Sequence, residues 1–339
     1  MPRFYYPFPS KAHPDDDRAE RELIAWLSEH NLLSDPRWEE RIRRGAVGKL
    51  IGRVIPDATY EGLLAVTLWS GWVFAVDDGI CGEAGLRPDP GNVATVHLWL
   101  REIMNDPSRY GEATECELET RFPAMAEFVR GLQFSTADMC MRIADLSTPA
   151  QYGRWCAEML TFFLGTLWEA VTQPTSAATV RDALRCRRVT VGVYPICGLL
   201  DSAAGYELPA SEYYDPNLSR LNKVAADVIG IANDVFSYGM ESALDDDSFN
   251  VVSVLIREQG LTAQQALDTA VRIHNDKVGQ SITLSETISG YASEELVRFT
   301  RQLPSLMRGN YDWSLTTDRY RVDDYYDLSK ALKIGEQSD

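Results

Sequence analysis

Apolar residues recur at helical spacing along nearly the whole chain, and no segment alternates in the way a half-buried strand does. Near the N-terminus, Leu23, Ile24 and Leu27 share one helix face behind an acidic first turn. Turn sequences rich in proline, glycine and aspartate separate the helical segments, and no flexible linker divides them. The pattern predicts an all-α fold, a single-domain helical bundle. Further helices are predicted over residues 36–54, 59–79, 91–105, 113–145, 149–172, 176–203, 216–243, 248–259, 262–288 and 291–309.

Both ends of the chain depart from this pattern. Residues 1–16 are rich in proline and aromatic residues and predict an extended arm, which is either disordered or packed over a pocket mouth. From Tyr311 onward the spacing is no longer helical, so we expect this segment to cross the surface. The helical domain is expected over residues 17–321, followed by a partly disordered tail over 322–339.

One predicted helix ends in two adjacent acids. Residues 63–76 are almost wholly apolar and are followed directly by Asp77 and Asp78. Neighbouring carboxylates at the end of a buried helix repel one another and are costly to desolvate, and a hard cation such as Mg²⁺ offsets both effects. The alternative is a helix end that reaches solvent at Asp77.

A second helix carries three oxygen donors in a row. Asn233, Ser237 and Glu241 follow one another at intervals of four, so they project from one helix face among apolar neighbours. Amide, hydroxyl and carboxylate oxygens are ligands that suit Mg²⁺. The alternative is a polar stripe turned to solvent or to another helix, but the apolar, small-residue sequence before the stripe favours a metal site.

Arginines occur in the same kind of setting. Arg187 precedes an apolar run that Gly192 and Pro195 should interrupt, and Arg319 lies near the C-terminus. Guanidinium groups suit phosphate oxygens, although any single arginine of an acidic protein is more often part of a surface ion pair. Together, the acidic clusters and the arginines indicate a diphosphate site at the mouth of an apolar pocket.

Composition narrows the choice of partner. The formal net charge is -17, from 50 acidic and 33 basic residues, which argues against nucleic acid. Six scattered cysteines form no CxxC pair, four distant histidines form no zinc motif, and a Walker-type phosphate loop is absent. With no signal-like N-terminus and no apolar run long enough to span a bilayer, the expected location is cytoplasmic, without membrane insertion.

These motifs resemble those of the microbial class I terpene synthases (terpene cyclases). Asn233, Asp234, Ser237 and Glu241 match that family's NDxxSxxxE metal motif, and Asp77 with Asp78 resembles its aspartate-rich motif. The resemblance also covers basic residues, in family order. Arg187 lies forty-six residues before Asn233, at the place of the family's diphosphate-sensing arginine, and Arg319 with Tyr320 forms its Arg-Tyr pair.

Two positions depart from the family pattern. The acid of the first motif is expected at residue 82, which is glycine here, and Glu83 follows one position later. Six residues after Asp77 correspond to ~240° on a helix, so Glu83 would not share the face of the aspartates unless the helix unwinds. The basic residue often found before the last motif glutamate is Met240.

The resemblance implies a class I terpenoid synthase bundle with the active-site pocket inside it. It implies that three Mg²⁺ ions hold the diphosphate of a linear prenyl diphosphate (farnesyl or geranylgeranyl), which is ionised and cyclised to a sesquiterpene or diterpene hydrocarbon or alcohol. Val73 is small where a larger aromatic residue could stand, and the extra room keeps geranylgeranyl diphosphate possible as the substrate. The implied residues are Arg187, Arg319 and Tyr320 as catalytic groups; Asp77, Asp78, Asn233, Ser237 and Glu241 as metal ligands; and Trp69, Val73, Phe74, Thr190, Val191, Gly192 and Trp313 as substrate contacts.

Plain core packing is at least as good an interpretation for the aromatic residues, which include Trp72, Phe162, Phe163 and Tyr194. Two other functions remain as alternatives. A chain-elongating prenyl diphosphate synthase would need a second aspartate-rich motif where this chain has NDxxSxxxE. A non-catalytic helical scaffold would leave the four motifs and their order unexplained. The expected partner is the prenyl diphosphate substrate, and a homodimer remains open.

Overall fold

The computed structural model describes residues 3–77, 89–111, 114–172, 178–244 and 249–320. All regular elements in these ranges are helices, which confirms the all-α prediction. Three short 3₁₀ or α turns, η2 (Pro107–Arg109), η3 (Pro123–Met125) and α11 (Ala210–Tyr213), lie between longer elements. The others are α1 (Asp16–Glu29), α2 (Pro36–Gly45), α3 (Val47–Val54), α4 (Tyr60–Val76), α5 (Pro90–Asn105), α6 (Leu118–Arg121), α7 (Ala126–Asp145), α8 (Pro149–Thr172), α9 (Val180–Thr190), α10 (Val193–Ala203), α12 (Pro216–Leu244), α13 (Val251–Gln259), α14 (Ala263–Ser289), α15 (Glu294–Thr300) and α16 (Leu303–Ser314).

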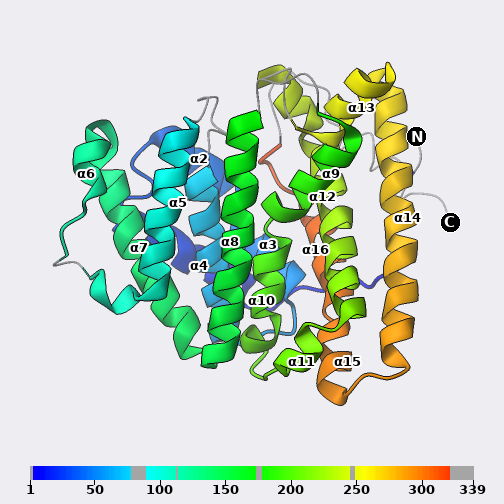
Figure 1. The fold of residues 1–339 in the computed structure, drawn as a ribbon, viewed down its shortest axis with the longest axis horizontal. Coiled ribbons are helices and arrows are strands. Elements are labelled where there is room, and N and C mark those ends of the chain that lie inside the picture. The colour runs from blue at the N-terminus through cyan, green and yellow to red at the C-terminus, as the bar shows by residue number, and fades with distance from the viewer. Residues whose placement is uncertain (1–2, 78–88, 112–113, 173–177, 245–248, 321–339) are drawn as a thin grey trace.

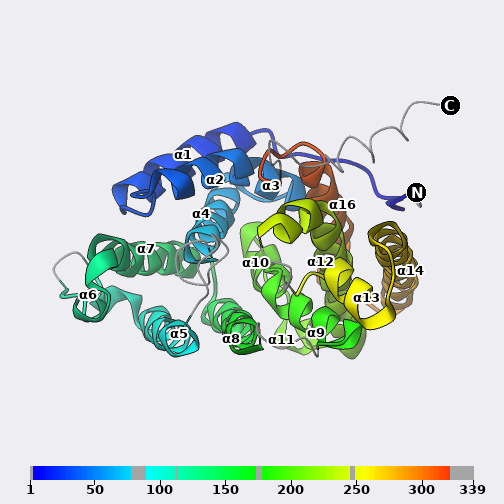
Figure 2. The ribbon, with the colours of Figure 1, turned by 90° about the horizontal axis from the view of Figure 1, so that it is seen from above.

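The long helices run side by side along the height of the molecule (Figure 1). Seen from above, α4 and α10 lie toward the middle, and α8 and α12 line the neighbouring positions (Figure 2). Helix α4 contacts α1, α3, α7 and α10. Because α4 is apolar on every side, it can be stable only when surrounded by other helices, and most of its side chains are buried. The Thr59 hydroxyl begins this helix by accepting from the Gly62 N–H at 3.0 Å.

Two predicted helices in the first half of the chain are each divided in the structure. The segment 36–54 breaks at Ala46, whose φ of 46° is left-handed, and this break turns α3 against α1. At Gly48 the two helices approach so closely that a Cβ would lie 2.6 Å from the Glu20 backbone nitrogen. The segment 113–145 breaks before α7 at Pro123, because proline cannot continue the preceding turn.

The C-terminal part of the fold differs from the expectation. The predicted helix 291–309 is two helices, α15 and α16, and α16 continues through Tyr311 to Ser314 instead of leaving the helical pattern. Trp313 is 2% exposed and donates from Nε1 to the Gly45 carbonyl at 2.6 Å. This long-range contact, which local spacing cannot reveal, fixes the last turn. The tail expected over 322–339 lies outside the described residues.

The N-terminal arm packs against the bundle in the described part of residues 1–16. The Phe4 ring stacks on Phe236 of α12 at 5.8 Å, and the Tyr6 ring stacks on Tyr311 of α16 at 4.4 Å. The Tyr6 hydroxyl lies 2.8 Å from Nε2 of His274 on α14. These contacts, which join the arm to three helices, bury aromatic surface that an isolated arm would expose.

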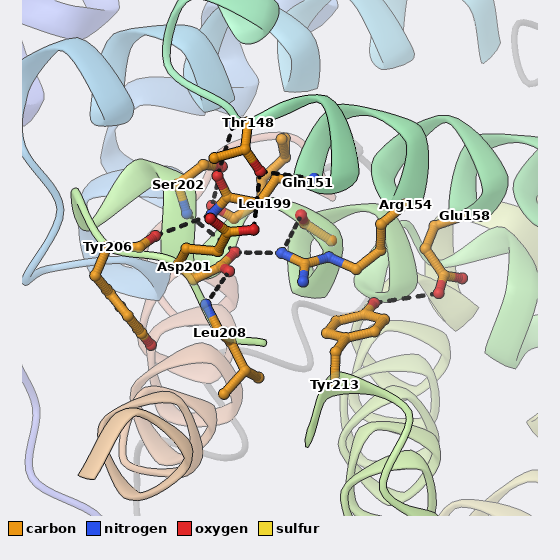
Figure 3. A network of polar contacts seen from close by, with 12 residues as sticks. Thr148, Gln151, Arg154, Glu158, Leu199, Asp201, Ser202, Tyr206, Leu208 and Tyr213 are labelled. Carbon is orange, nitrogen blue, oxygen red and sulfur yellow. Dashed lines mark hydrogen bonds and ion pairs between the residues drawn. The ribbon is translucent and has the colours of Figure 1, made fainter. Parts of the chain in front are cut away.

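A buried ion pair joins α8 to α10 near the end of the bundle where α8 begins (Figure 3). Arg154 Nη2 lies 2.5 Å from Asp201 Oδ1, and both side chains are almost fully buried. The other carboxylate oxygen of Asp201 accepts from the Leu208 N–H at 2.8 Å. Tyr213 lies under the guanidinium, whose Cζ is 4.1 Å from the ring centroid, and donates to Glu158 at 3.2 Å. The charges are thus paired, as burial requires.

Candidate active site

The oxygen-donor stripe lies on the last three turns of α12. Asn233 makes two short contacts: its Oδ1 accepts from Nη2 of Arg187 at 2.6 Å, and its Nδ2 donates to the Tyr320 hydroxyl at 2.6 Å. Ser237 is 1% exposed and follows one turn later, and Glu241 one turn after that. The structure thus brings two predicted catalytic residues, which are distant in sequence, to the first residue of the stripe.

Arg187 also pairs with the residue next to Asn233. Its Nε lies 2.7 Å from Oδ1 of Asp234, a side chain that is 2% exposed. On its other side, Nη1 donates to the Thr190 hydroxyl at 3.4 Å, and that hydroxyl donates to Glu169 of α8 at 3.1 Å. Sequence reasoning placed Asp234 in the motif but gave it no role, and it missed Glu169, which no local signal marks.

The charge around Arg187 is predominantly negative. Burial lowers the pKa of Arg187, but the carboxylates of Asp234, Glu169 and Glu241 outweigh burial and raise it above its ordinary value. Burial, reinforced by Glu241 and Glu169, raises the pKa of Asp234 to about 7, against the opposing effects of Arg187 and the Val251 N–H. Such an excess of carboxylates favours the binding of further cations.

Arg319 and Tyr320 connect α4 with α12. The Arg319 guanidinium lies over the Phe74 ring, with Cζ 4.4 Å from the centroid, while Tyr320 reaches Asn233. Phe74 comes three residues before Asp77, which forms the C-cap of α4. The adjacent residues Arg319 and Tyr320 therefore link the ends of the two helices that carry the predicted metal residues.

The break between α9 and α10 faces the same region. Thr190 ends α9, Val191 caps it, and Gly192 has φ 75°, a conformation that side chains disfavour. The six-membered ring of Trp69 lies 3.6 Å from the place that a Cβ on Gly192 would take. The sequence predicted this interruption at Gly192, and α4 presents an aromatic ring to it.

Asn250 is a site residue that the sequence analysis missed. Its Oδ1 accepts from the Val252 N–H at 2.9 Å and so caps α13. Its Nδ2 lies 2.9 Å from Oε2 of Glu241, 2.7 Å from the Asp234 carbonyl and 3.5 Å from the Ser237 hydroxyl. One side chain therefore ties the start of α13 to the stripe. The sequence did contain one signal for it, because an asparagine directly before an apolar helical run is typical of a helix N-cap.

The remaining predicted residues divide into three groups. Asp78 and Glu83 lie outside the described residues. Val73 is buried, and Trp313 contacts Tyr320 edge-on at 5.7 Å while its indole nitrogen is used in packing. Several aromatic side chains make contacts of ordinary core packing: Trp69 donates to Met159 at 3.2 Å, Trp72 donates to Thr136 at 3.0 Å, Phe163 stacks on His97 at 4.6 Å, and Phe162 is 1% exposed.

The donor set fits a hard divalent cation. Asn233 Oδ1, Ser237 Oγ and the Glu241 carboxylate lie along one helix face, next to carboxylates that outnumber the local arginine. In the described ranges, no three His, Cys, Asp or Glu side chains lie close enough together to form a metal site. A cation bound here would therefore need amide and hydroxyl oxygens as ligands as well.

None of the described helices is long and apolar enough to cross a membrane.

Comparison with known proteins agrees with this geometry. Residues 68–280 match the family described as terpene synthase family 2, C-terminal metal binding. A germacradien-6-ol synthase of Streptomyces pratensis is 30% identical over 97% of this chain and 88% of its own length. A 4-epi-cubebol synthase of Streptosporangium roseum, which cyclises (2E,6E)-farnesyl diphosphate, is 26% identical over 94% of this chain and 92% of its own.

Solved structures share the fold. The 2-methylisoborneol synthase of Streptomyces coelicolor, solved with Mg²⁺ and 2-fluoroneryl diphosphate, gives a TM-score of 0.81 at 23% identity, over 96% of this chain and 99% of that one. The SVS_A2 protein from ancestral sequence reconstruction gives 0.81 at 24% identity, over 93% and 90%. The match covers well over half of the chain and includes Asp77, Arg187 and the α12 stripe. The chain therefore belongs to terpene synthase family 2, and it is a class I terpene synthase, a lyase that acts on diphosphates.

Proposed function

We propose that this enzyme is a Mg²⁺-dependent cyclase of farnesyl diphosphate that releases diphosphate and forms a sesquiterpene hydrocarbon or alcohol. The observation that carries the proposal is the convergence of Arg187, Asn233 and Tyr320 from three separate parts of the chain. The Arg187 guanidinium and the Tyr320 hydroxyl, which can donate hydrogen bonds to a diphosphate, lie beside the stripe whose oxygens can bind a cation. Binding of a metal diphosphate requires both kinds of group. The relatives whose names state a substrate cyclise farnesyl diphosphate, which favours the fifteen-carbon over the twenty-carbon substrate.

Asn233, Ser237 and Glu241 would hold Mg²⁺ from α12, and Asp77 with Asp78 would do so from the end of α4. Three ions are expected with bound diphosphate. When bound, Mg²⁺ neutralises the charge that builds up on the departing diphosphate.

Hydrogen-bond donors of the protein itself would also bind the diphosphate oxygens. The guanidinium groups of Arg187 and Arg319 and the hydroxyl of Tyr320 would donate hydrogen bonds to the diphosphate, and donors fixed in advance stabilise the charge of ionisation most effectively. Thr190, Val191 and Gly192 would contact the substrate at the helix break, opposite Trp69. The rings of Trp69, Phe74 and Trp313, beside Val73, would exclude water and offer aromatic faces to the cation.

The test is incubation of the purified enzyme with geranyl, farnesyl and geranylgeranyl diphosphates, with and without Mg²⁺. A cyclic C15 product that forms from farnesyl diphosphate only with Mg²⁺ supports the proposal. A C20 hydrocarbon from geranylgeranyl diphosphate alone would replace the substrate assignment. Prenyl chain elongation, or no turnover of any of the three, would overturn it.

The metal residues need variants and a matched control. Asn233→Ala and Glu241→Ala should abolish turnover and also the thermal stabilisation of the protein by Mg²⁺ with inorganic diphosphate. Lys223→Ala, on the exposed side of the same helix, should keep both. Retained turnover in both alanine variants would remove the metal assignment.

A further inference from the structure

The N-terminal arm, residues 3–9, lies along the bundle as an extended segment. It runs past α16 toward α14 (Figure 2). Every second side chain of the arm is half-buried, namely Phe4, Tyr6 and Phe8, and the residues between them are exposed. A two-residue period is typical of an extended chain that has one side against a surface. The arm therefore presents a row of three aromatic side chains to the helices beneath it.

One side chain of α14 holds the main chain on both sides of Phe4. The Tyr5 N–H donates to Oδ1 of Asn275 at 2.8 Å, and Nδ2 of Asn275 donates to the Arg3 carbonyl at 2.8 Å. This is the kind of paired contact that a neighbouring strand would make with the arm. Because both bonds are made to main-chain groups next to Phe4, they fix where its ring lies.

The Phe4 ring lies where three helices meet. It stacks on Phe236 of α12 at 5.8 Å, with the two ring planes 9° apart. Its other contacts are with His274 of α14, edge-on at 4.6 Å, and with Tyr311 of α16 at 5.5 Å. Aromatic pairs in such geometries are attractive beyond the surface that they bury. One ring thus bridges α12, α14 and α16.

The part of α12 that carries the stripe has an apolar core of its own. Buried residues of α12, α13 and α14 form this second core, among them Ile231 and Val235, which lie on either side of Asn233 in the sequence. Phe4 packs against this second core, whereas Phe8 packs against the main core of the bundle. The two phenylalanines of the arm therefore support different parts of the molecule.

Two of the helices that Phe4 bridges carry the site. Phe236 comes three residues after Asn233 on α12 and directly before Ser237. Helix α16 leads into Tyr320, whose hydroxyl accepts from Nδ2 of Asn233 at 2.6 Å. The spacing of α12 and α16 sets this contact, and the Phe4 ring lies between the same two helices.

We propose that Phe4, held by Asn275, is a positioning residue for the metal stripe. It touches neither the metal nor the substrate, but it fixes the end of α12 so that Asn233, Ser237 and Glu241 keep the spacing that Mg²⁺ with diphosphate needs. Mg²⁺ demands nearly ideal octahedral geometry, so a small shift of its ligands should weaken binding. The inference rests on the metal site proposed above.

The Mg²⁺ dependence tests the role of Phe4. Phe4→Ala should raise the Mg²⁺ concentration at half-maximal rate about tenfold, as loss of support behind metal ligands commonly does. The Mg²⁺ concentration that gives half of the thermal stabilisation by Mg²⁺ with inorganic diphosphate should rise by a similar factor. Phe4→Leu, which keeps part of the apolar volume, should show smaller shifts in the same direction, and it carries the comparison if Phe4→Ala does not fold.

Phe8→Ala is the matched control, because it removes an equal ring from the same arm. Its melting temperature without Mg²⁺ should fall, but both Mg²⁺ dependences should stay native. A native Mg²⁺ dependence in folded Phe4→Ala would overturn the proposal. Equal shifts in Phe4→Ala and Phe8→Ala would overturn it as well, since they would reflect general destabilisation.

Two further variants complete the test. Asn275→Ala keeps the Phe4 ring but loses both hydrogen bonds to the arm, so it should shift both Mg²⁺ dependences in the same direction. Native dependences in Asn275→Ala would contradict the hold by Asn275. Glu241→Ala separates this inference from the proposed function. If Glu241→Ala loses the stabilisation by Mg²⁺ with diphosphate while Phe4→Ala keeps it at native Mg²⁺ concentrations, only the positioning role fails; if Glu241→Ala keeps it, the metal site itself fails.

Discussion

The guanidinium of Arg187 donates to Oδ1 of Asn233 at 2.6 Å, across forty-six residues of sequence. Its Nε lies 2.7 Å from Asp234, so one side chain of α9 holds two consecutive side chains of α12. The planar guanidinium reaches both side chains at once, with a hydrogen bond to Asn233 and an ion pair to Asp234, whereas the lysine ammonium is a compact point charge.

Arg187→Lys should therefore lower kcat/KM by about 10² or more, because it keeps the charge but loses the paired donors. Steady-state kinetics with farnesyl diphosphate measures the change, and circular dichroism checks that the fold is kept. Arg185→Lys, at a 63% exposed side chain of the same helix, is the matched control. Native kcat/KM in Arg187→Lys would mean that charge alone suffices at this position.

Asn250 can be tested without losing its helix cap. Asn250→Asp keeps an oxygen that accepts from the Val252 N–H but replaces the donor that faces Glu241 with a second carboxylate. We expect the Mg²⁺ concentration at half-maximal rate to shift at least several-fold. Thermal stability without Mg²⁺ should also fall, because a buried carboxylate at residue 250 then faces the carboxylate of Glu241. Asn250→Ala should lose the cap as well and destabilise the protein by ~1 kcal/mol. An unchanged Mg²⁺ dependence in Asn250→Asp would confine the residue to capping.

Two buried histidines should make the protein less stable in weak acid. Burial lowers the pKa of His97 and of His274 to about 4. The unfolded chain, with an ordinary histidine pKa near 6.5, binds more protons than the folded one between these values, so stability is lost as the pH falls from about 6.5 to 4. Each histidine should cost about 2 kcal/mol between pH 7 and pH 5.

Urea unfolding at the two pH values measures this loss. His97→Gln and His274→Gln should each reduce the difference between the two free energies of unfolding. Equal pH dependence in the native protein and in both buried-site variants would show that other groups carry the acid sensitivity.

Loss of the Arg154–Asp201 ion pair shown in Figure 3 should lower the stability of the protein without changing its catalysis. Asp201→Asn should destabilise the protein by about 3–5 kcal/mol, because it leaves the Arg154 charge buried without its partner. The free energy of unfolding should fall, while KM at low temperature should stay close to native. Glu207→Gln, at an exposed acid nearby, should change neither quantity. A large rise in KM of folded Asp201→Asn would instead couple this pair to the active site.

The sequence alone determined the positions of the long helices and of the metal-ligand stripe, through helical periodicity and through the spacing of particular residue types. Apolar spacing is a local property, so it located the long helices, including α12, and the stripe at Asn233, Ser237 and Glu241 followed from four-residue steps on one helix. The same local reasoning identified the interruption at Gly192.

Only the tertiary structure decided which side chains meet. The position of Asn250 against Glu241, the bridge from Phe74 through Arg319 and Tyr320 to Asn233, and the continuation of α16 to Ser314 all depend on contacts between distant segments. The left-handed break at Ala46, which turns α3 against α1, likewise goes with a close contact between distant segments at Gly48. Local spacing fixes which face of a helix a residue occupies, but packing of the whole chain fixes what that face contacts.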